Sequence, residues 1–98
     1  MITDLEVGGL RTAIPASSND AEFFPGMVKR WGLGFLLNTE DASTGRAAHS
    51  LAWAGLANTY YWLDPTRRLA GVLLTQILPF ADDRVLRLFE EFESAVYA

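Results

Sequence analysis

Hydrophobic and polar positions divide the chain into an irregular beginning and a strongly patterned remainder. Residues 1–30 show little periodicity and contain glycines, prolines and short polar runs, which are typical of turns and extended loops. We therefore expect an extended segment here that lies over other protein. Phe23 and Phe24, just before Pro25, are either its anchors or ordinary core residues.

Three apolar runs after this segment predict three β-strands. Residues 31–37 are apolar, and the two glycines among them argue against a helix. Residues 56–63 are rich in aromatic and β-favouring side chains, and residues 69–78 are apolar on both faces in the middle of the run. The polar residues 64–68 form a turn, so the last two strands should pair as an antiparallel hairpin. We expect the charges of this turn, including that of Asp64, to be solvated.

An amphipathic helix is predicted over residues 83–96. Asp82 or Asp83 can cap it by accepting its first free N–H groups. One apolar stripe recurs at three- and four-residue spacing and comprises Val85, Leu88, Phe89, Phe92 and Val96. The charged residues fall largely on the other side of the helix and are Arg84, Arg87, Glu90, Glu91 and Glu93.

The pattern as a whole predicts an α+β fold: a three-stranded antiparallel sheet, a C-terminal amphipathic helix and an extended N-terminal segment. One helix can cover only one face of the sheet. Apolar positions on the opposite face must therefore meet a partner chain or a missing part of the same chain.

Composition narrows the classes of function. With 98 residues, half of them hydrophobic, the chain forms one domain at most. The net charge is −4 and Lys29 is the single lysine, so no basic stripe predicts binding to nucleic acid. No apolar run is long enough to span a membrane, and the first residues do not resemble a signal peptide, which favours a cytoplasmic location. Cysteine is absent and His49 is the single histidine, so we expect neither a metal site nor a cofactor.

The most informative stretch surrounds Trp53, Ala54 and Gly55. A short strand-like approach over residues 48–53 reaches a turn at Ala54 and Gly55, and the aromatic strand follows. Small residues between bulky ones let the main chain come close to a neighbouring strand or to a bound substrate.

No complete catalytic apparatus is visible in the chain. None of the five serines lies in a Gly-x-Ser-x-Gly motif or is followed three residues later by lysine, and no Tyr-x-Asn occurs. Ser50 is adjacent to His49, but neighbouring residues of a strand point to opposite faces. We therefore expect no catalytic residue in this chain.

An ordered series of motifs nevertheless resembles a known family. It looks like the C-terminal third of the serine hydrolases related to class C β-lactamases, penicillin-binding proteins and family VIII esterases. The similarity covers nearly all of the chain, and the motifs in order are Phe24-Pro25-Gly26, Trp31-Gly32-Leu33-Gly34-Phe35, Trp53-Ala54-Gly55, Asn58-Thr59-Tyr60-Tyr61-Trp62-Leu63-Asp64-Pro65 and Gly71-Val72-Leu73-Leu74-Thr75-Gln76.

The resemblance implies roles for one short region. Family members carry a Ser-x-x-Lys nucleophile motif, a Tyr-x-Asn motif and a third motif of the Lys-Thr-Gly type. Only the third matches, as Trp53-Ala54-Gly55, so these residues and Leu56 would bind substrate. The main-chain N–H of Leu56 would be one of two oxyanion donors. Trp53 in place of lysine removes the cation that would hold a β-lactam carboxylate, which favours an ester-like substrate.

The resemblance also implies that the chain is a fragment. Residues 1–30 would cross from an absent helical region, and residues 31–98 would form the last strands and helix of a β-lactamase-like α/β domain. The complete protein would hydrolyse a carboxylic ester or amide through an acyl-enzyme, while this chain alone would be inactive. The alternative is a small α+β interaction module that associates through its uncovered sheet face.

Overall fold

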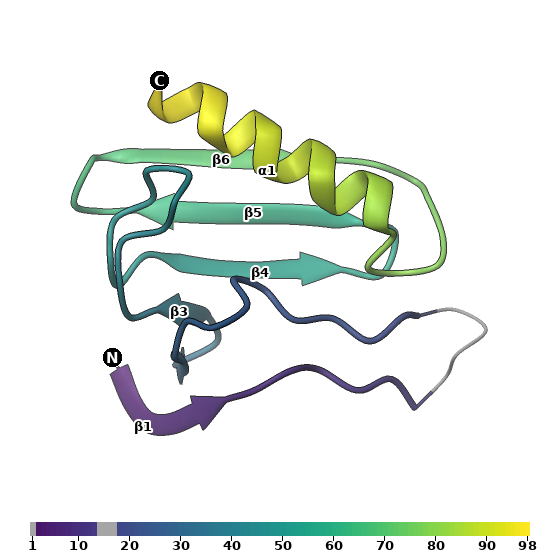
Figure 1. The fold of residues 1–98 in the computed structure, drawn as a ribbon, viewed down its shortest axis with the longest axis horizontal. Helices are drawn as coiled ribbons and strands as arrows, with labels where there is room; N and C mark the ends of the chain where they lie inside the picture. Colours follow the sequence, from purple (N-terminus) through teal and green to yellow (C-terminus); the bar gives the residue numbers. More distant parts are fainter. Residues whose placement is uncertain (1, 14–17) are drawn as a thin grey trace.

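The computed structural model of the chain describes residues 2–13 and 18–98. Residues 1 and 14–17, which belong to the segment predicted to be extended, lie outside the described residues. In the described part, one antiparallel sheet contains strands that neighbour each other in chain order, and one helix, α1 (Asp83–Tyr97), lies across its last two strands (Figure 1). The strands are β1 (Ile2–Val7), β2 (Lys29–Gly32), β3 (Leu36–Asn38), β4 (Leu51–Gly55), β5 (Thr59–Asp64) and β6 (Leu69–Leu73).

The α+β class with a C-terminal helix is confirmed, but the prediction of three strands is wrong, since the described residues form six. Two of the additional strands begin within residues 1–30, where β1 pairs with β2. β1 was missed because a short strand that contains several polar residues leaves little periodicity, and β2 was missed as a separate strand because it runs into the apolar residues 31–37.

The predicted strand over residues 31–37 is a hairpin. β2 ends at Gly32 and β3 starts at Leu36, and the two strands pair with Trp31 opposite Leu36. Gly34 has a φ of +92°, which glycine adopts without steric cost. Gly32 N–H donates to the Phe35 carbonyl at 2.8 Å and closes the turn. Because every residue of the turn is apolar or glycine, the hydrophobic pattern does not show that the chain reverses direction between β2 and β3.

Two further boundaries differ from the prediction. Trp53, Ala54 and Gly55 lie within β4, and the turn comes later, at residues 56–58. β6 ends at Leu73, and not at residue 78. The predicted hairpin is confirmed, because β5 pairs with β6 from Tyr60 opposite Leu73 to Asp64 opposite Leu69.

The core lies between α1 and one face of the sheet. Trp62 is fully buried, and its ring contacts Phe89 and Phe92 at centroid distances of 5.6 and 5.7 Å. Tyr60 stacks on Phe89 at 5.1 Å. Phe23 packs against this cluster as a partly buried residue, so it is part of the chain's own core.

Helix α1 begins as predicted and buries one unexpected residue. The side chain of Asp82 accepts hydrogen bonds from the N–H groups of Arg84 and Val85, which confirms the cap. Leu88 and Val96, predicted to face the sheet, are 51% and 38% exposed. Glu93, predicted to be on the solvent side, is 1% exposed.

A buried ion pair explains the position of Glu93. Its carboxylate accepts hydrogen bonds from the Thr44 hydroxyl and from the Arg46 guanidinium, which is itself buried. The Phe24 ring covers the same guanidinium at 4.9 Å, so Phe24 also packs within the chain. The polar loop after β3 is therefore held against α1 by a buried ion pair and a hydrogen bond. The periodicity of apolar residues along the helix does not predict these contacts.

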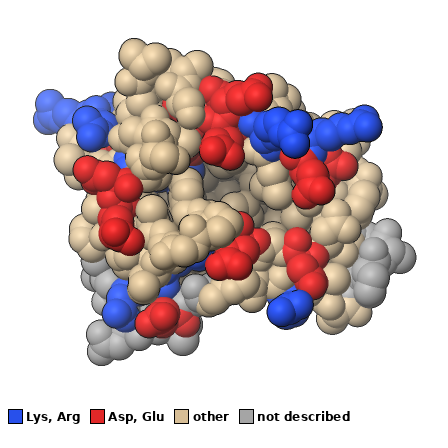
Figure 2. Space-filling model, viewed as in Figure 1, with Lys and Arg blue, Asp and Glu red and all other residues tan. Residues whose placement is uncertain are grey.

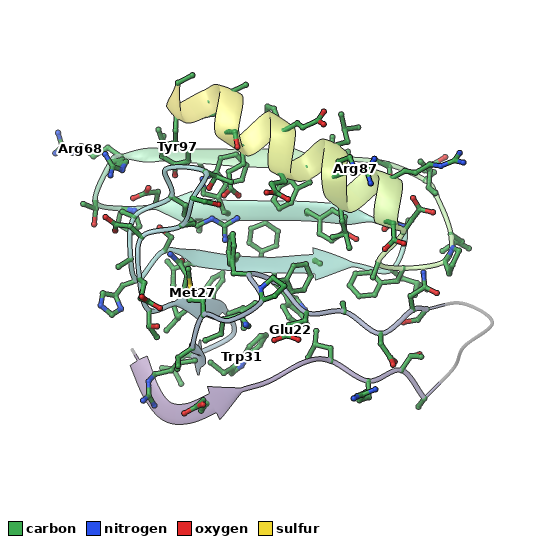
Figure 3. All side chains as sticks on the ribbon, viewed as in Figure 1. Glu22, Met27, Trp31, Arg68, Arg87 and Tyr97 are labelled. Carbon is green, nitrogen blue, oxygen red and sulfur yellow. The ribbon has the colours of Figure 1, made fainter. Side chains whose placement is uncertain are left out.

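Asp64 is also buried, and the prediction of a solvated hairpin end is wrong for this residue. Its carboxylate accepts from the N–H groups of Ala47 and Arg67, at 3.0 and 2.9 Å, and from the Tyr97 hydroxyl at 2.7 Å. Burial alone would raise the pKa of Asp64, but these hydrogen bonds outweigh it and lower the pKa below its ordinary value. Figure 3 shows Tyr97 at the end of α1, beside the hairpin end that carries Arg68.

The other face of the sheet, which we call the open face, carries no helix in the described residues. The register of β4, β5 and β6 places Trp53, Tyr61 and Val72 side by side on it. Val72 and Leu63 are 53% and 38% exposed. Among the described helices, none is both long and apolar enough to cross a bilayer.

Candidate functional site

Part of β4 has an unpaired edge inside the sheet, in addition to the outer edges that β1 and β6 have among the described residues. β5 pairs with β4 along its whole length, from Leu51 to Gly55. β3 pairs on the other side with Leu51 and Ala52 alone. In the described part of the chain, Trp53, Ala54 and Gly55 therefore have a strand on one edge and none on the other.

The four residues predicted to bind substrate are consecutive at this edge. Trp53 and Gly55 lie on the open face, and Ala54 lies on the opposite face, where it packs against the core. Leu56 is the first residue of the turn and is 58% exposed. A Cβ atom added at Gly55 would lie 3.6 Å from the Thr59 Cβ, which is an ordinary contact. The sheet itself therefore does not require glycine at this position.

Aromatic rings from neighbouring strands lie beside the edge. Trp31 from β2 meets Trp53 edge to face, with ring centroids 4.7 Å apart. Tyr61 is the cross-strand partner of Trp53, and Phe35 meets Tyr61 edge to face at 6.5 Å. Such a surface offers apolar contact area and no positive charge to a ligand at the edge.

The turn after β4 is held by Asn58, which sequence analysis assigned to a strand. Asn58 is fully buried and has a φ of +60°, a conformation that asparagine tolerates better than most residues. Its side-chain amide donates to the carbonyls of Ile77 and Pro79, both at 2.7 Å. Asparagine after a Gly-x-x sequence is the signal that could have identified the turn.

Tyr60 completes this arrangement. Its hydroxyl donates to the Asn58 Oδ1 at 2.7 Å. Burial raises the pKa of Tyr60 to about 12, and the nearby Asp82 carboxylate adds to the effect. The hydroxyl therefore stays protonated and remains a donor at neutral pH.

Neither Ser50 nor His49, which immediately precede β4 in the described part of the chain, is placed to act as a nucleophile or base at this edge. The Ser50 hydroxyl is buried and donates to the Ala47 carbonyl at 2.7 Å, and His49 is an exposed loop residue with a φ of +65°. Among the described residues, no three histidine, aspartate or glutamate side chains are placed to hold a metal ion. The unpaired part of this edge can offer main-chain hydrogen bonds and apolar contact to a neighbouring group.

A separate cavity of about 400 Å³ lies on the helix-covered side of the sheet. Its walls are largely apolar and include Phe23, Met27, Leu86 and Phe89. Figure 2, drawn from this side, shows acidic and basic side chains interspersed, without a continuous basic patch. The cavity is on the opposite face from Trp53 and Gly55 and does not contribute to the site at the edge of β4.

Comparison with known proteins identifies one family. The family model described as Beta-lactamase matches residues 3–95, which is nearly the whole chain. No curated protein and no solved structure compared with the chain matches it. The match includes β4 and all four residues at its free edge.

Proposed function

Because the chain belongs to the β-lactamase family, we propose that it is the C-terminal part of a serine hydrolase and supplies the strand that flanks the acyl group of the substrate. The observation that supports this function is that β3 ends before Trp53. Trp53, Ala54 and Gly55 therefore pair with β5 on one edge and have no strand beside them on the other edge in the described part of the chain. An unpaired strand edge presents main-chain N–H and C=O groups to whatever lies beside it.

The proposed reaction proceeds through an acyl-enzyme. A serine hydroxyl from another part of the protein attacks the carbonyl carbon, and negative charge develops on the carbonyl oxygen. The N–H of Leu56 donates to this oxygen, together with an N–H of the nucleophile itself. The tetrahedral intermediate then expels the alcohol or amine, and water hydrolyses the ester that remains. One such donor contributes about 2.7–4 kcal/mol to stabilisation of the transition state.

The substrate in this proposal is a neutral ester or amide. Trp53 stands where the resemblance has a lysine, and its ring packs on Trp31 at 4.7 Å. An anionic substrate would gain no ion pair from an indole, whereas an apolar acyl or alcohol group gains contact area.

The decisive experiment uses Gly55. The chain is joined to the nucleophile-bearing part of a family esterase, and acylation by p-nitrophenyl acetate is measured for the wild-type chimera, Gly55→Ala and Gly55→Val. The valine side chain projects beside the edge, so we expect acylation to fall by about 10²–10³, the range for loss of an oxyanion donor. Gly55→Ala is the graded control, because its Cβ meets Thr59 at an ordinary 3.6 Å.

A normal acylation rate in Gly55→Val would show that the edge does not face the substrate. The isolated chain provides a second check, since it should not hydrolyse p-nitrophenyl acetate or nitrocefin above background. Turnover that survives alanine substitution of all five serines would contradict the proposal.

A second candidate function is an interaction module that associates through the open face. The exposed Val72 and Leu63, next to the aromatic residues, favour it, because apolar side chains gathered on one sheet face usually meet a partner. The partner would be the remainder of the hydrolase chain or a second copy. Sedimentation and NMR of the isolated chain separate the two functions: a stable dimer with a well-dispersed spectrum supports the module, and aggregation or a poorly dispersed spectrum supports the fragment.

A further inference from the structure

The turn at residues 56–58 is anchored far more firmly than a solvent-exposed connection between two strands requires. Asn58 N–H donates to the Gly55 carbonyl at 3.1 Å, which closes the turn on itself. The Thr75 hydroxyl reaches the carbonyls of Ala57 and Asn58 at 2.6 and 3.0 Å, and Ile77 N–H donates to Ala57 at 3.2 Å. Of the turn residues, Leu56 alone is more than half exposed.

The Asn58 side chain uses its full hydrogen-bonding capacity for this purpose. Its amide nitrogen donates twice, to the carbonyls of Ile77 and Pro79. Its oxygen accepts twice, from the Tyr60 hydroxyl at 2.7 Å and from Asp82 N–H at 3.0 Å. A primary amide has two donors and two principal acceptor positions, so no capacity is left over.

These bonds connect the turn to rigid parts of the fold. Tyr60 belongs to β5, which is paired on both edges by β4 and β6, and Asp82 is the N-cap of α1. The other two bonds go to the segment between β6 and α1, and a side chain fixed at four points has one orientation, so the main chain that carries it is fixed with it.

We propose that Asn58 is a positioning residue, which holds the turn so that the main-chain N–H of Leu56 keeps one orientation beside the free edge of β4. This inference rests on the proposed function, in which that N–H donates to the oxyanion. Asn58 does not touch the substrate and acts through the turn. A preorganised donor stabilises developing charge without reorganisation, which a mobile turn cannot do.

The test is NMR relaxation of the Leu56 amide in the chimera with the nucleophile-bearing part of a family esterase, because the proposed fragment alone is not expected to give a well-dispersed spectrum. Asn58→Gly keeps the positive φ and removes all four side-chain bonds. We expect the order parameter of Leu56 to fall from about 0.85, the value of a rigid backbone, to below about 0.6, with a changed amide shift. Tyr60→Phe removes one of the four bonds and should give an intermediate shift, which keeps the test available if Asn58→Gly does not fold.

Tyr97→Phe is the matched control. It removes buried hydrogen bonds to Asp64 and Trp62 at the opposite end of β5, so it should lower stability and leave the Leu56 amide as in the wild type. If Asn58 had a purely structural role, Asn58→Gly would likewise lower stability and leave the Leu56 amide as in the wild type. A rigid Leu56 amide with the wild-type shift in Asn58→Gly, or in Tyr60→Phe should the former not fold, would overturn the inference.

The two proposals fail separately. If Gly55→Val leaves acylation of the chimera unchanged, the proposed function is wrong whatever the amide shows, and the catalytic purpose of Asn58 is lost with it. If Gly55→Val inactivates the chimera while the Leu56 amide stays rigid in Asn58→Gly, the positioning role alone is wrong.

Discussion

Gly71 offers a sharp test of how the core is packed. It lies in β6 opposite Trp62, whose indole ring covers it. A Cβ added at Gly71 would lie 2.1 Å from Cη2 and 2.2 Å from Cζ3 of that ring. Carbon atoms pack at about 3.5 Å or more, so in Gly71→Ala the ring must move by about 1.4 Å.

The indole ring of Trp62 cannot move by this distance without displacing neighbouring side chains. Trp62 is fully buried, its rim is in contact with Phe89, Phe92 and Tyr97, and its Nε1 donates to the Tyr97 hydroxyl at 2.9 Å. Overpacking usually costs about 1–3 kcal/mol, and loss of a buried aromatic side chain costs about 3–5 kcal/mol. We expect Gly71→Ala to lower the free energy of unfolding by about 3 kcal/mol or more, out of about 5–15 kcal/mol for a domain of this kind.

Urea unfolding followed by far-UV circular dichroism measures this difference, at several protein concentrations so that any association is detected. Gly55→Ala is the control: it is also a strand glycine, but the new methyl group meets only Thr59 at 3.6 Å. It should be neutral or stabilise by about 0.4–1 kcal/mol, because alanine reduces the entropy of the unfolded chain. If both variants unfold at the wild-type urea concentration, Trp62 is not seated on Gly71 and the description of the core is wrong.

Three further predictions concern buried polar groups. Glu93→Ala leaves the buried Arg46 without its carboxylate and should cost about 3–5 kcal/mol in urea unfolding, whereas the double change Arg46→Met with Glu93→Leu should cost much less; equal costs would refute the buried pair. The pKa of Asp64 is lowered in the folded state, so its contribution to stability is present above its unfolded value of 3.8 and is lost as the pH falls through the folded pKa. Asp64→Asn should therefore be less stable at neutral pH and show a shallower loss of stability in acid; an unchanged acid profile would contradict this. Burial and then the hydrogen bond to Asp64 raise the pKa of Tyr97 to about 12, so its contribution is present below its unfolded value of 10.0 and is lost as the pH rises through about 12. Tyr97→Phe should flatten the alkaline loss of stability, and an alkaline transition identical to that of the wild type would remove Tyr97 as its source.

Sequence reasoning succeeded where one periodicity covers a whole element. The spacing of Val85 and Phe89 defined the helix, and the acidic residue before it defined the cap. The polar turn between the aromatic strand and the next apolar run defined the β5–β6 hairpin. In each case the local pattern and the tertiary packing require the same residues.

It failed where polar residues are held by distant partners. Glu93 is forty-nine positions from Thr44, and nothing in the helical pattern distinguishes it from the exposed Glu90 and Glu91. Asn58 was assigned to a strand and Asp64 to a solvated turn, although both side chains are buried and make several hydrogen bonds. The candidate site residues Trp53 to Leu56 were proposed from the resemblance, whereas the short β3, which leaves one edge of β4 unpaired beyond Ala52, was not predicted.

The three tryptophans divide into two optical environments. Trp62 is fully buried in the core and hydrogen-bonded, while Trp31 and Trp53 form a close pair with ring centroids 4.7 Å apart. Indoles at this separation couple through their strong far-ultraviolet transitions, so the pair should add an exciton couplet to the far-ultraviolet dichroism that the isolated Trp62 does not give. Binding of a ligand or partner beside Trp53 should therefore change the signal of the Trp31–Trp53 pair and leave the signal of Trp62 unchanged.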